Sequence, residues 1–417
     1  MLTRRQAWLV AIVATFTMTV SYVDRVTLAV LAPTVTKVLD ISEESYGWLG
    51  SIFAVAYLFG TPLAGWWIDR AGARKGLVAS IIAWSAVAAL HALIPNFAAL
   101  FVLRLALGFT EAPSFPGAAQ TVQRILPERE RERGFGVLFT GSSIGAMLAP
   151  PLAGMMFSLV GWRGAFLLTT LAGLIWIPLW IAVTRSKAVR DQLAVAVSDG
   201  DDAPQPRPTF RDLVLHPLML RALAGVFAAA PVFGFVQTWG AKYLVRTFQT
   251  AQKDVGHYLW LPPLMFDLGA ILFGDLASRQ RRAPGAPPRL LFAIGATCAA
   301  AMIAMPHVET SWESMIVLGI AMAGGGIMYT LITSDLLSRM PPGSVSLAGG
   351  ILAGAQSLAA IISNPLIGRV VDRFQSYDVV YTGLAIWVLP GSLLWLAWRP
   401  MPRYTHRAEL PRAQISG

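Results

Sequence analysis

The sequence predicts an all-α membrane protein with twelve transmembrane helices in two pseudo-symmetric bundles of six. Two observations predict this class. The chain of 417 residues is 55% hydrophobic and only 13% charged, whereas about 25% of the residues in a soluble domain are charged. Apolar runs of about 20 residues recur along the chain, the length that a helix needs to cross a hydrocarbon core of about 30 Å.

Hydropathy and the positions of Gly, Pro and charged residues define the spans. They cover residues 8–31, 47–69, 75–94, 97–122, 134–160, 163–184, 216–245, 254–278, 289–306, 312–337, 346–371 and 376–398. The first apolar run follows Arg4 and Arg5, as in a signal peptide. It is long, contains charged residues and lacks a convincing small-residue cleavage site, so we expect it to be retained as a span.

One long polar stretch, residues 185–215, separates the sixth span from the seventh. It contains an acidic segment and three prolines, a composition typical of a flexible linker. Residues 210–214 within it are expected to form a short interfacial helix. The predicted organisation is therefore a six-helix bundle over residues 1–184, a cytoplasmic linker over 185–215, a second bundle over 216–398 and a cytoplasmic tail over 399–417.

The net charge of +10 is unevenly distributed along the chain. With the N-terminus inside, Lys and Arg are about three times as frequent on cytoplasmic segments as on outer ones, which is the positive-inside pattern. Both termini are therefore expected in the cytoplasm, and nucleic acid is not an expected partner. The single Cys298 excludes an intrachain disulfide and a thiolate cluster for a metal.

Charged residues lie within the apolar spans, beginning with Asp24 and Arg25 in the first. Ionisable groups at membrane depth are costly and usually mark the path of an ion or substrate. At a helical rise of about 1.5 Å per residue, Asp24, Arg25 and Arg104 lie roughly 9 to 11 Å below the outer face. Glu111 and Asp267 lie near 20 Å by the same rule. This spacing predicts a cationic layer above an acidic one.

Hydroxyl and amide side chains at intermediate depth could contact a polyhydroxylated ligand. Each such group more often makes a hydrogen bond between helices, and that alternative stays open for all of them. The candidates are Tyr22, Tyr57, Gln237, Gln356 and Asn364.

Arg25 is the best candidate for an anion clamp, because a guanidinium stays charged and can hold a carboxylate through two parallel hydrogen bonds. The alternative is a structural ion pair with Asp24 or another acid. Asp24 lies at the depth of Arg104, so a bridge between these two explains Arg104 as well as substrate contact does.

Glu111 and Asp24 are the candidates for carrying a proton. Burial raises the pKa of a carboxylate and a nearby cation lowers it, so a group balanced between the two can load and release a proton. Permanent pairing is the alternative for either acid. The five histidines lie at span ends or in loops, which leaves coupling to the carboxylates. No set of converging oxygen ligands for sodium is apparent.

The segment that follows the second span is echoed after the eighth span by residues 274–282, where Ser278 replaces the expected acid. Paired halves of six spans are a transporter architecture. The first copy resembles the cytoplasmic gating motif of major facilitator superfamily transporters, and its residues here are Gly65, Asp69, Arg70, Gly72 and Arg74. The resemblance implies charge pairs that latch the two halves together in one state. The alternative is that these residues only anchor helix ends.

Three further segments resemble the anion:cation symporter branch of that superfamily. They are Tyr22-x-Asp24-Arg25, the run from Arg104 to Glu111-Ala-Pro, and residues 261–269 around Asp267. The branch includes bacterial hexuronate and galactonate carriers, aromatic-acid relatives and the sialic-acid carrier. The resemblance implies that Arg25 contacts the substrate carboxylate and that Asp24 and Glu111 carry the proton. For Asp267, a third titrating group, an acceptor for sugar hydroxyls and a partner for a backbone break remain open.

The sequence thus predicts a proton-coupled symporter that imports an organic anion across a bacterial inner membrane. A sugar acid such as a hexuronate or aldonate is the favoured cargo, with aromatic carboxylates as the alternative. We expect a monomer in the lipid bilayer that uses the proton gradient and needs no cofactor or metal. A proton-coupled exporter and a sensor that has lost transport are the rivals. An enzyme is not expected, because no nucleophile–base pair appears at depth.

Overall fold

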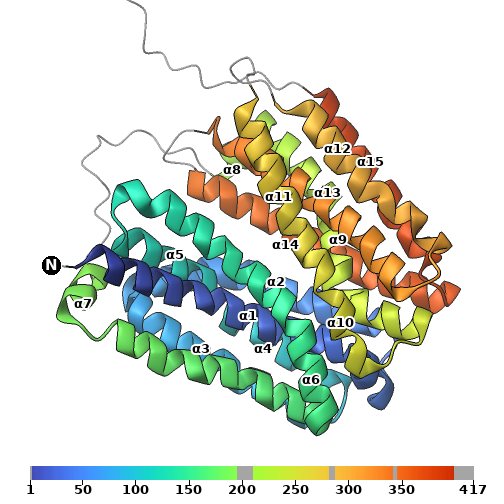
Figure 1. Cartoon of the computed structure of the whole chain (residues 1–417), viewed down its shortest axis with the longest axis horizontal. Helices are drawn as coiled ribbons and strands as arrows, with labels where there is room; N and C mark the ends of the chain where they lie inside the picture. The colour runs from blue at the N-terminus through green and yellow to red at the C-terminus, as the bar shows by residue number, and fades with distance from the viewer. Residues whose placement is uncertain (1, 195–209, 281–286, 341–344, 399–417) are drawn as a thin grey trace, which may run out of the picture.

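The computed structural model describes residues 2–194, 210–280, 287–340 and 345–398, and these form helices without any strand. Helices of the first half occupy one side of the molecule and those of the second half the other (Figure 1). The first half contains α1 (Arg4–Val38), α2 (Glu43–Ala71), α3 (Ala73–Leu90), α4 (Phe97–Glu111), α5 (Ser114–Ile125), α6 (Glu128–Val183) and α7 (Lys187–Ala194). The second half contains α8 (Phe210–Val214), α9 (Pro217–Phe248), α10 (Gly256–Leu259), α11 (Leu261–Arg279), α12 (Arg289–Ala299), α13 (Ser311–Leu337), α14 (Val345–Phe374) and α15 (Asp378–Ala397).

Eleven helical segments within these described ranges are long and apolar enough to cross a membrane. Helix α6 alone runs for 56 residues, but Gly161 has φ 70° and ψ 178° and breaks it. This break falls between the predicted spans 134–160 and 163–184. The predicted fourth span, 97–122, is not continuous, because α4 ends at Glu111 and α5 begins at Ser114 after Pro113. A proline lacks the backbone N–H that would continue the α4 ladder.

Side-chain caps fix where several helices begin. Thr3 and Gln6 form a reciprocal capping box at the start of α1, and Thr310 and Glu313 form another at α13. Asn96 caps α4 by accepting a hydrogen bond from the backbone of the first turn. Capped starts of this kind leave fewer backbone N–H groups without partners, which matters where water is scarce.

Helix α1 extends well beyond the predicted span 8–31, and its last turn reaches Val38. The predicted linker is also partly helical, since α7 lies inside residues 185–215. Arg124 donates to the carbonyl of Leu193 at 2.6 Å and Gln192 donates to the carbonyl of Arg124 at 3.1 Å. The first part of the predicted flexible linker is therefore a helix, and these contacts hold α7 against α5. Residues 195–209 lie outside the described chain, and α8 occupies the predicted segment 210–214.

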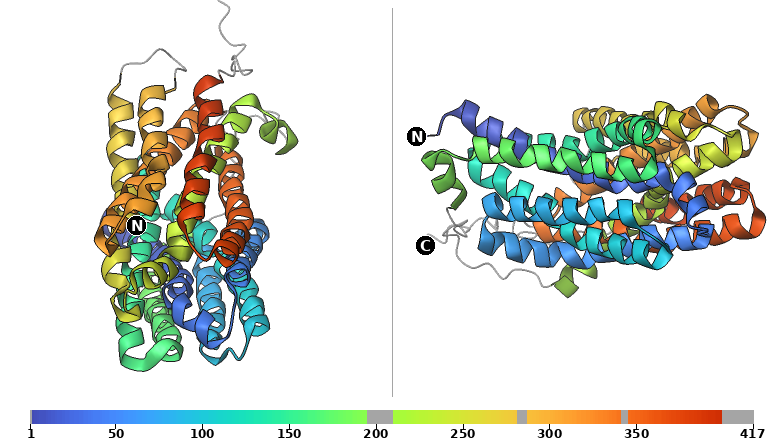
Figure 2. Two further views of the ribbon diagram at one scale, coloured as in Figure 1. Left: turned by 90° about the vertical axis from the view of Figure 1, so that its right-hand side faces the viewer. Right: turned by 90° about the horizontal axis from the view of Figure 1, so that it is seen from below.

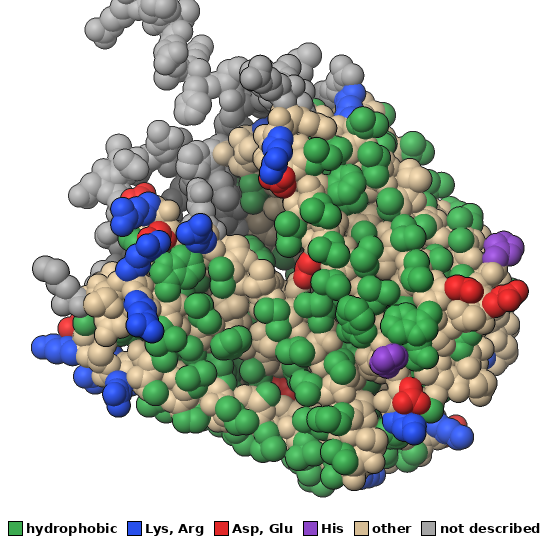
Figure 3. Space-filling view, in the orientation of Figure 1, with side chains coloured by type: hydrophobic (Ala, Val, Ile, Leu, Met, Phe, Trp, Pro, Cys, Tyr) green, Lys and Arg blue, Asp and Glu red, His purple; other side chains and the backbone are tan. Residues whose placement is uncertain are grey.

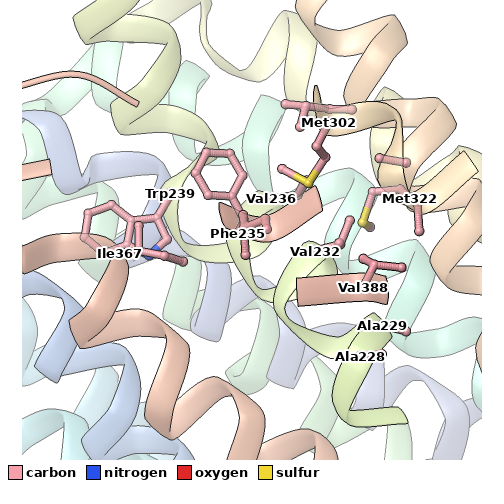
Figure 4. Packing of buried hydrophobic residues seen from close by; sticks show 14 of the residues in the cluster. Ala228, Ala229, Val232, Phe235, Val236, Trp239, Met302, Met322, Ile367 and Val388 are labelled. Carbon is pink, nitrogen blue, oxygen red and sulfur yellow. The ribbon is translucent and has the colours of Figure 1, made fainter. Parts of the chain in front are cut away.

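The core of the second half surrounds α9. One face of this helix presents small residues, Ala228 and Ala229, and then Val232, Phe235 and Trp239, which are buried against other helices (Figure 4). Small residues allow close approach of helices, and the large rings fill the remaining space. Helix α9 packs against α13, α14 and α15, and it also contacts α1 of the first half.

The two halves meet along α2 with α14 and α1 with α9. Their polar contacts gather at the end where α1 finishes and α2 begins. Lys242 Nζ lies 2.7 Å from a Glu43 carboxylate oxygen, and the Asp372 carboxylate accepts the backbone N–H groups of Glu43 and Glu44 at 3.1 and 2.8 Å. The halves converge at this end (Figure 1), and the N-terminus lies at the other end of the molecule (Figure 2).

The opposite end of the molecule is open between the halves. Figure 3 shows the surface hollowed between them toward the end that carries the N-terminus. Gly65 and Gly72 of the predicted gating motif have no side-chain or backbone atom of another segment within 4 Å of where a Cβ would lie. The described structure is therefore closed at the end where α1 finishes and open at the other.

Candidate functional site

Arg25 and Glu111 form a buried ion pair between α1 and α4. The Arg25 Nη2 and Nε atoms donate to Glu111 Oε2 at 3.1 and 3.3 Å, and Ser21 Oγ donates to the same oxygen at 3.0 Å. The Glu111 side chain is 0% exposed and that of Arg25 is 21% exposed. One edge of the guanidinium therefore remains open to the space between the halves.

Three aromatic rings surround the Arg25 guanidinium. Its central carbon lies 4.7 Å from the ring centre of Tyr22 and 4.8 Å from those of Phe53 and Tyr57. Arg104 lies over the same Phe53 ring at 4.7 Å. Aromatic faces attract cations within about 6 Å of the ring centre, so these rings hold two guanidinium groups close together in a site with little water.

The predicted separation of Arg25 and Glu111 into two layers is wrong. Because α1 runs to Val38, Arg25 lies about 20 Å from the end of its helix at a rise of 1.5 Å per residue. Glu111 lies about 21 Å from the start of α4 at Phe97 by the same measure. The two residues are thus at one depth, and Arg104 remains nearer the end where the halves meet.

The Asp24–Arg104 bridge considered from the sequence is not formed. Both Asp24 carboxylate oxygens are buried without a hydrogen-bond partner, as are Arg104 Nε and Nη1. Asp24 points toward Trp84 of α3 inside the first half, about 100° around α1 from Arg25. The different depths of Asp24 and Arg104 explain the absence of the bridge. Asp24 and Glu111 thus occupy separate environments.

The predicted amide residues Asn364 and Gln237 lie at the seam between the halves. Asn364 is buried, accepts a hydrogen bond from Trp239 Nε1 at 3.2 Å and packs against Gly50 of α2. Gln237 lines a small void together with residues of α1, α6 and α10. Asn364 is therefore committed to a contact between helices in this conformation, as the alternative in the sequence analysis allowed.

Asp267 of α11 contacts the first half. Ser143 Oγ of α6 donates to Asp267 Oδ1 at 2.7 Å. Two residues along α6 from Ser143, a Cβ on Gly145 would lie 2.6 Å from the Tyr22 Cβ, and the Tyr22 ring lies against Arg25. Asp267 therefore belongs to the same central region as the ion pair.

The gating-motif residues make contacts within the first half. Asp69 accepts from Gln120 Nε2 at 2.7 Å, and Arg74 Nε donates to Thr184 Oγ1 at 3.3 Å. Arg70 stacks over Trp66 at 3.8 Å. None of the hydrogen bonds or ion pairs of Asp69, Arg70 and Arg74 in the described chain reaches the second half, in agreement with the opening at that end.

Sequence reasoning missed Ser21 and Phe53, which complete the Arg25 site. Ser21 precedes Arg25 by one helical turn, and Phe53 precedes Tyr57 by one turn, so both share a face with a predicted residue. That periodicity was the available signal. Lys242 and Asp372, which join the halves, gave a weaker signal because each lies near the end of a predicted span.

In this arrangement, the carboxylate of a ligand can bind Arg25 in place of the Glu111 carboxylate. Arg25 Nη1 makes no hydrogen bond to the described residues, whereas its Nε and Nη2 contact Glu111. A guanidinium binds carboxylates in a planar, two-pronged geometry. When Glu111 is neutral, the whole fork becomes available to an external carboxylate.

Comparisons with known proteins identify transporters that are similar to this chain. The chain is 25% identical to the hexuronate transporter of Escherichia coli (strain K12), an alignment that covers 97% of this chain and 98% of that protein. It is 27% identical to the D-galactonate transporter of Escherichia coli O6:H1, covering 89% and 90%. It is 24% identical to the probable galactarate/D-glucarate transporter of Bacillus subtilis (strain 168), covering 90% and 88%.

A solved structure shares the fold. The bacterial homologue of the human lysosomal transporter Spinster, in an inward-facing and unoccupied conformation, matches with a TM-score of 0.78 at 17% identity and covers 95% of this chain and 97% of that one. Residues 14–363 match the sequence profile of the Major Facilitator Superfamily. The chain therefore belongs to the Major Facilitator Superfamily.

Proposed function

We propose that this protein is a secondary active transporter that imports a sugar acid together with protons across a bacterial inner membrane. The relatives named for hexuronate, galactonate and galactarate transport support the substrate class. The proton gradient supplies the energy, and no cofactor takes part.

The observation that carries this proposal is the Arg25–Glu111 pair. A permanently charged guanidinium is held at mid-depth by an acid that can be neutralised. Hydrogen bonds that involve a charged group contribute about 1.5 to 3 kcal/mol each, so the pair is stable enough to persist and weak enough to exchange. Protonation of Glu111 would release Arg25, and the carboxylate of the substrate would take its place.

Transport follows by alternating access. Binding of the anion and proton from outside is followed by rocking of the two halves, which opens the site to the cytoplasm. Deprotonation of Glu111 then restores its pair with Arg25 and expels the anion. Asp24, whose carboxylate oxygens are buried without a hydrogen-bond partner among the described residues, is the second candidate for a proton.

We further propose that the two stretches of α6 on either side of Gly161 are separate spans, so that twelve helices cross the membrane with both termini in the cytoplasm. The bundles comprise residues 1–184 and 216–398, joined by a linker over 185–215 and followed by a tail over 399–417. The open end of the described structure would then face the cytoplasm.

The test is uptake into proteoliposomes that contain the purified full-length protein. With an acidic exterior, labelled D-glucuronate or D-galactonate should accumulate inside, and a protonophore should abolish the accumulation. Vesicles with Arg25→Ala protein serve as the control and should not accumulate the label. Expulsion of internal label by the same gradient would instead identify a proton-coupled exporter.

A further inference from the structure

Asp267 has an orientation that is fixed by the packing of α11. Its neighbours Phe266 and Gly269 lie against α13, where a Cβ on Gly326 would meet the Phe266 carbonyl oxygen at 2.1 Å and a Cβ on Gly269 would meet the Ala323 carbonyl oxygen at 2.4 Å. Successive residues are about 100° apart around a helix, so Asp267 is turned away from this contact. It faces α6 of the first half.

Ser143 is presented to Asp267 by an equally fixed helix. Gly141 and Gly145 seat α6 on α1, where a Cβ on either would lie 2.6 Å from the carbonyl oxygen of Thr15 or Thr19. Ser143 is two residues from each glycine and so lies on the other side of α6, about 160° around the helix. Its hydroxyl reaches Asp267 Oδ1 at 2.7 Å.

The surroundings of Asp267 contain a hydroxyl and no cation. Among the described residues, Asp267 forms no ion pair, and its carboxylate accepts a hydrogen bond from Ser143. Its Ser143 donor is two residues from Gly145, where a Cβ would lie 2.6 Å from the Tyr22 Cβ, and the Tyr22 ring lies against the Arg25 guanidinium. Asp267 therefore lies near the Arg25–Glu111 pair and comes from the other half of the molecule.

We propose that Asp267 is the specificity residue for the hydroxyl groups of the substrate, and that the Ser143 hydroxyl occupies its place while the site is empty. A serine hydroxyl and a sugar hydroxyl are the same kind of donor, and the two oxygens of a carboxylate can accept neighbouring hydroxyls. This inference rests on the proposed function, because it requires the substrate carboxylate at Arg25.

The consequence is selection for polyhydroxylated acids over acids that carry only a carboxylate. A hydroxyl-free acid would bind Arg25 without contacting Asp267, which would keep its Ser143 donor. A polyhydroxylated acid would replace that donor on Oδ1 and add a second hydrogen bond on Oδ2. A site built to hydrogen-bond hydroxyls discriminates strongly against analogues that lack them.

The experiment measures binding to the purified full-length protein by competition. The probes are D-glucuronate, D-galactonate and D-galactarate, with hexanoate and adipate as hydroxyl-free acids of the same length. Asp267→Ala should weaken the hydroxylated acids by roughly 10- to 100-fold and leave the hydroxyl-free acids within about 2-fold, as expected for hydrogen bonds to a charged group. Asp267→Asn should fall between, since an amide oxygen still accepts.

Two further variants distinguish a failure of this inference from a failure of the proposed function. Ser143→Ala should retain or improve affinity for the hydroxylated acids, because it removes the competing donor, whereas Arg25→Ala should lose all five probes. Gel filtration and thermal unfolding identify any variant that fails to fold, and Asp267→Asn then carries the comparison. If the wild-type protein binds none of the probes, the proposed function is wrong and this inference falls with it.

The inference alone is overturned by any of the following results while wild-type binding stands. Asp267→Ala and Asp267→Asn could leave the ratio of affinities for the two classes of acid unchanged, with or without an equal loss in both. They could also keep binding and counterflow while losing proton-driven uptake, which would make Asp267 a proton carrier. A loss in Ser143→Ala equal to that in Asp267→Ala would assign Ser143 to the substrate and overturn its role in the empty site.

Discussion

Arg25 donates two hydrogen bonds to a single oxygen of Glu111, Oε2, and the other oxygen of that carboxylate has no partner. A fully two-pronged pair would place one nitrogen on each oxygen. The Arg25–Glu111 pair uses only one of the two carboxylate oxygens, whereas a carboxylate ligand can use both. A substrate carboxylate can therefore replace Glu111 with a gain in hydrogen-bond geometry.

Arg25→Lys should weaken substrate binding at least 10-fold, because a point charge cannot reproduce the planar fork or stack on the rings of Tyr22, Phe53 and Tyr57. Equilibrium competition binding with D-glucuronate and D-galactonate measures the loss. Arg279→Lys is the matched control, since Arg279 is an exposed partner of Asp275. Equal affinity of both variants would remove Arg25 from the binding site.

Glu111→Gln should abolish uptake driven by an acidic exterior while preserving counterflow exchange. The amide imitates the protonated acid, so Arg25 stays available but no proton can be released. Net uptake and counterflow are measured in the same proteoliposome preparation. Net uptake that still followed the proton gradient would show that another group couples transport.

Asp372→Asn should weaken the closed end of the molecule. The Asp372 carboxylate accepts the first-turn N–H groups of α2 across the two halves, and a charged cap of this kind contributes about 0.5 to 2 kcal/mol. Spin labels at Val38→Cys and Gln249→Cys, in a Cys298→Ser background, should report a new population at longer distance.

The matched control for Asp372 is Glu44→Gln. Glu44 pairs with Arg369 at 2.6 Å between the same helices, but both side chains are substantially exposed. Exposed ion pairs contribute about 0 to 1 kcal/mol, so the distance distribution should change little. A shift in Glu44→Gln as large as that in Asp372→Asn would show that total charge, rather than the cap, holds this end.

Gly368→Ala should also disfavour the closed end, by about 1 to 3 kcal/mol as for other overpacked contacts. A Cβ at this position would lie 2.3 Å from the Glu43 carbonyl oxygen, so α14 and α2 must separate. The same pair of spin labels measures the displacement. Gly349→Ala on the same helix has open space around it and should behave as wild type.

A buried charge cluster in the second half should contribute to the stability of the folded protein and not to transport. Arg221 Nη2 lies 2.6 Å from Asp335 Oδ2, and Arg339 contacts the other oxygen. Asp335→Asn leaves buried guanidinium charge without compensation and should cost about 3 to 5 kcal/mol, seen as a lower thermal unfolding temperature. Asp275→Asn, at an exposed pair, should leave that temperature nearly unchanged. Equal losses in the two variants would contradict this assignment.

The sequence predicted most helices because a bilayer imposes length and apolarity on each one separately. The errors fell where a boundary depends on contacts rather than on hydropathy. Helix α1 extends to Val38 because its last turns pack against α9 and the short turn Gln252–Asp254, and residues there need not look apolar. Helix α7 is fixed by Arg124, which no local pattern in the linker reveals.

The sequence by itself determined that charged residues stand inside apolar spans, and so it identified Arg25, Glu111, Asp24 and Asp267 as residues to explain. Only the tertiary structure decided their partners. The predicted end of the first span, residue 31, falls seven residues before Val38, and seven residues of helix correspond to about 10 Å of depth. Pairing between distant segments, such as Arg25 with Glu111 or Asp267 with Ser143, depends on how whole helices pack, and hydropathy along the chain contains no record of that packing.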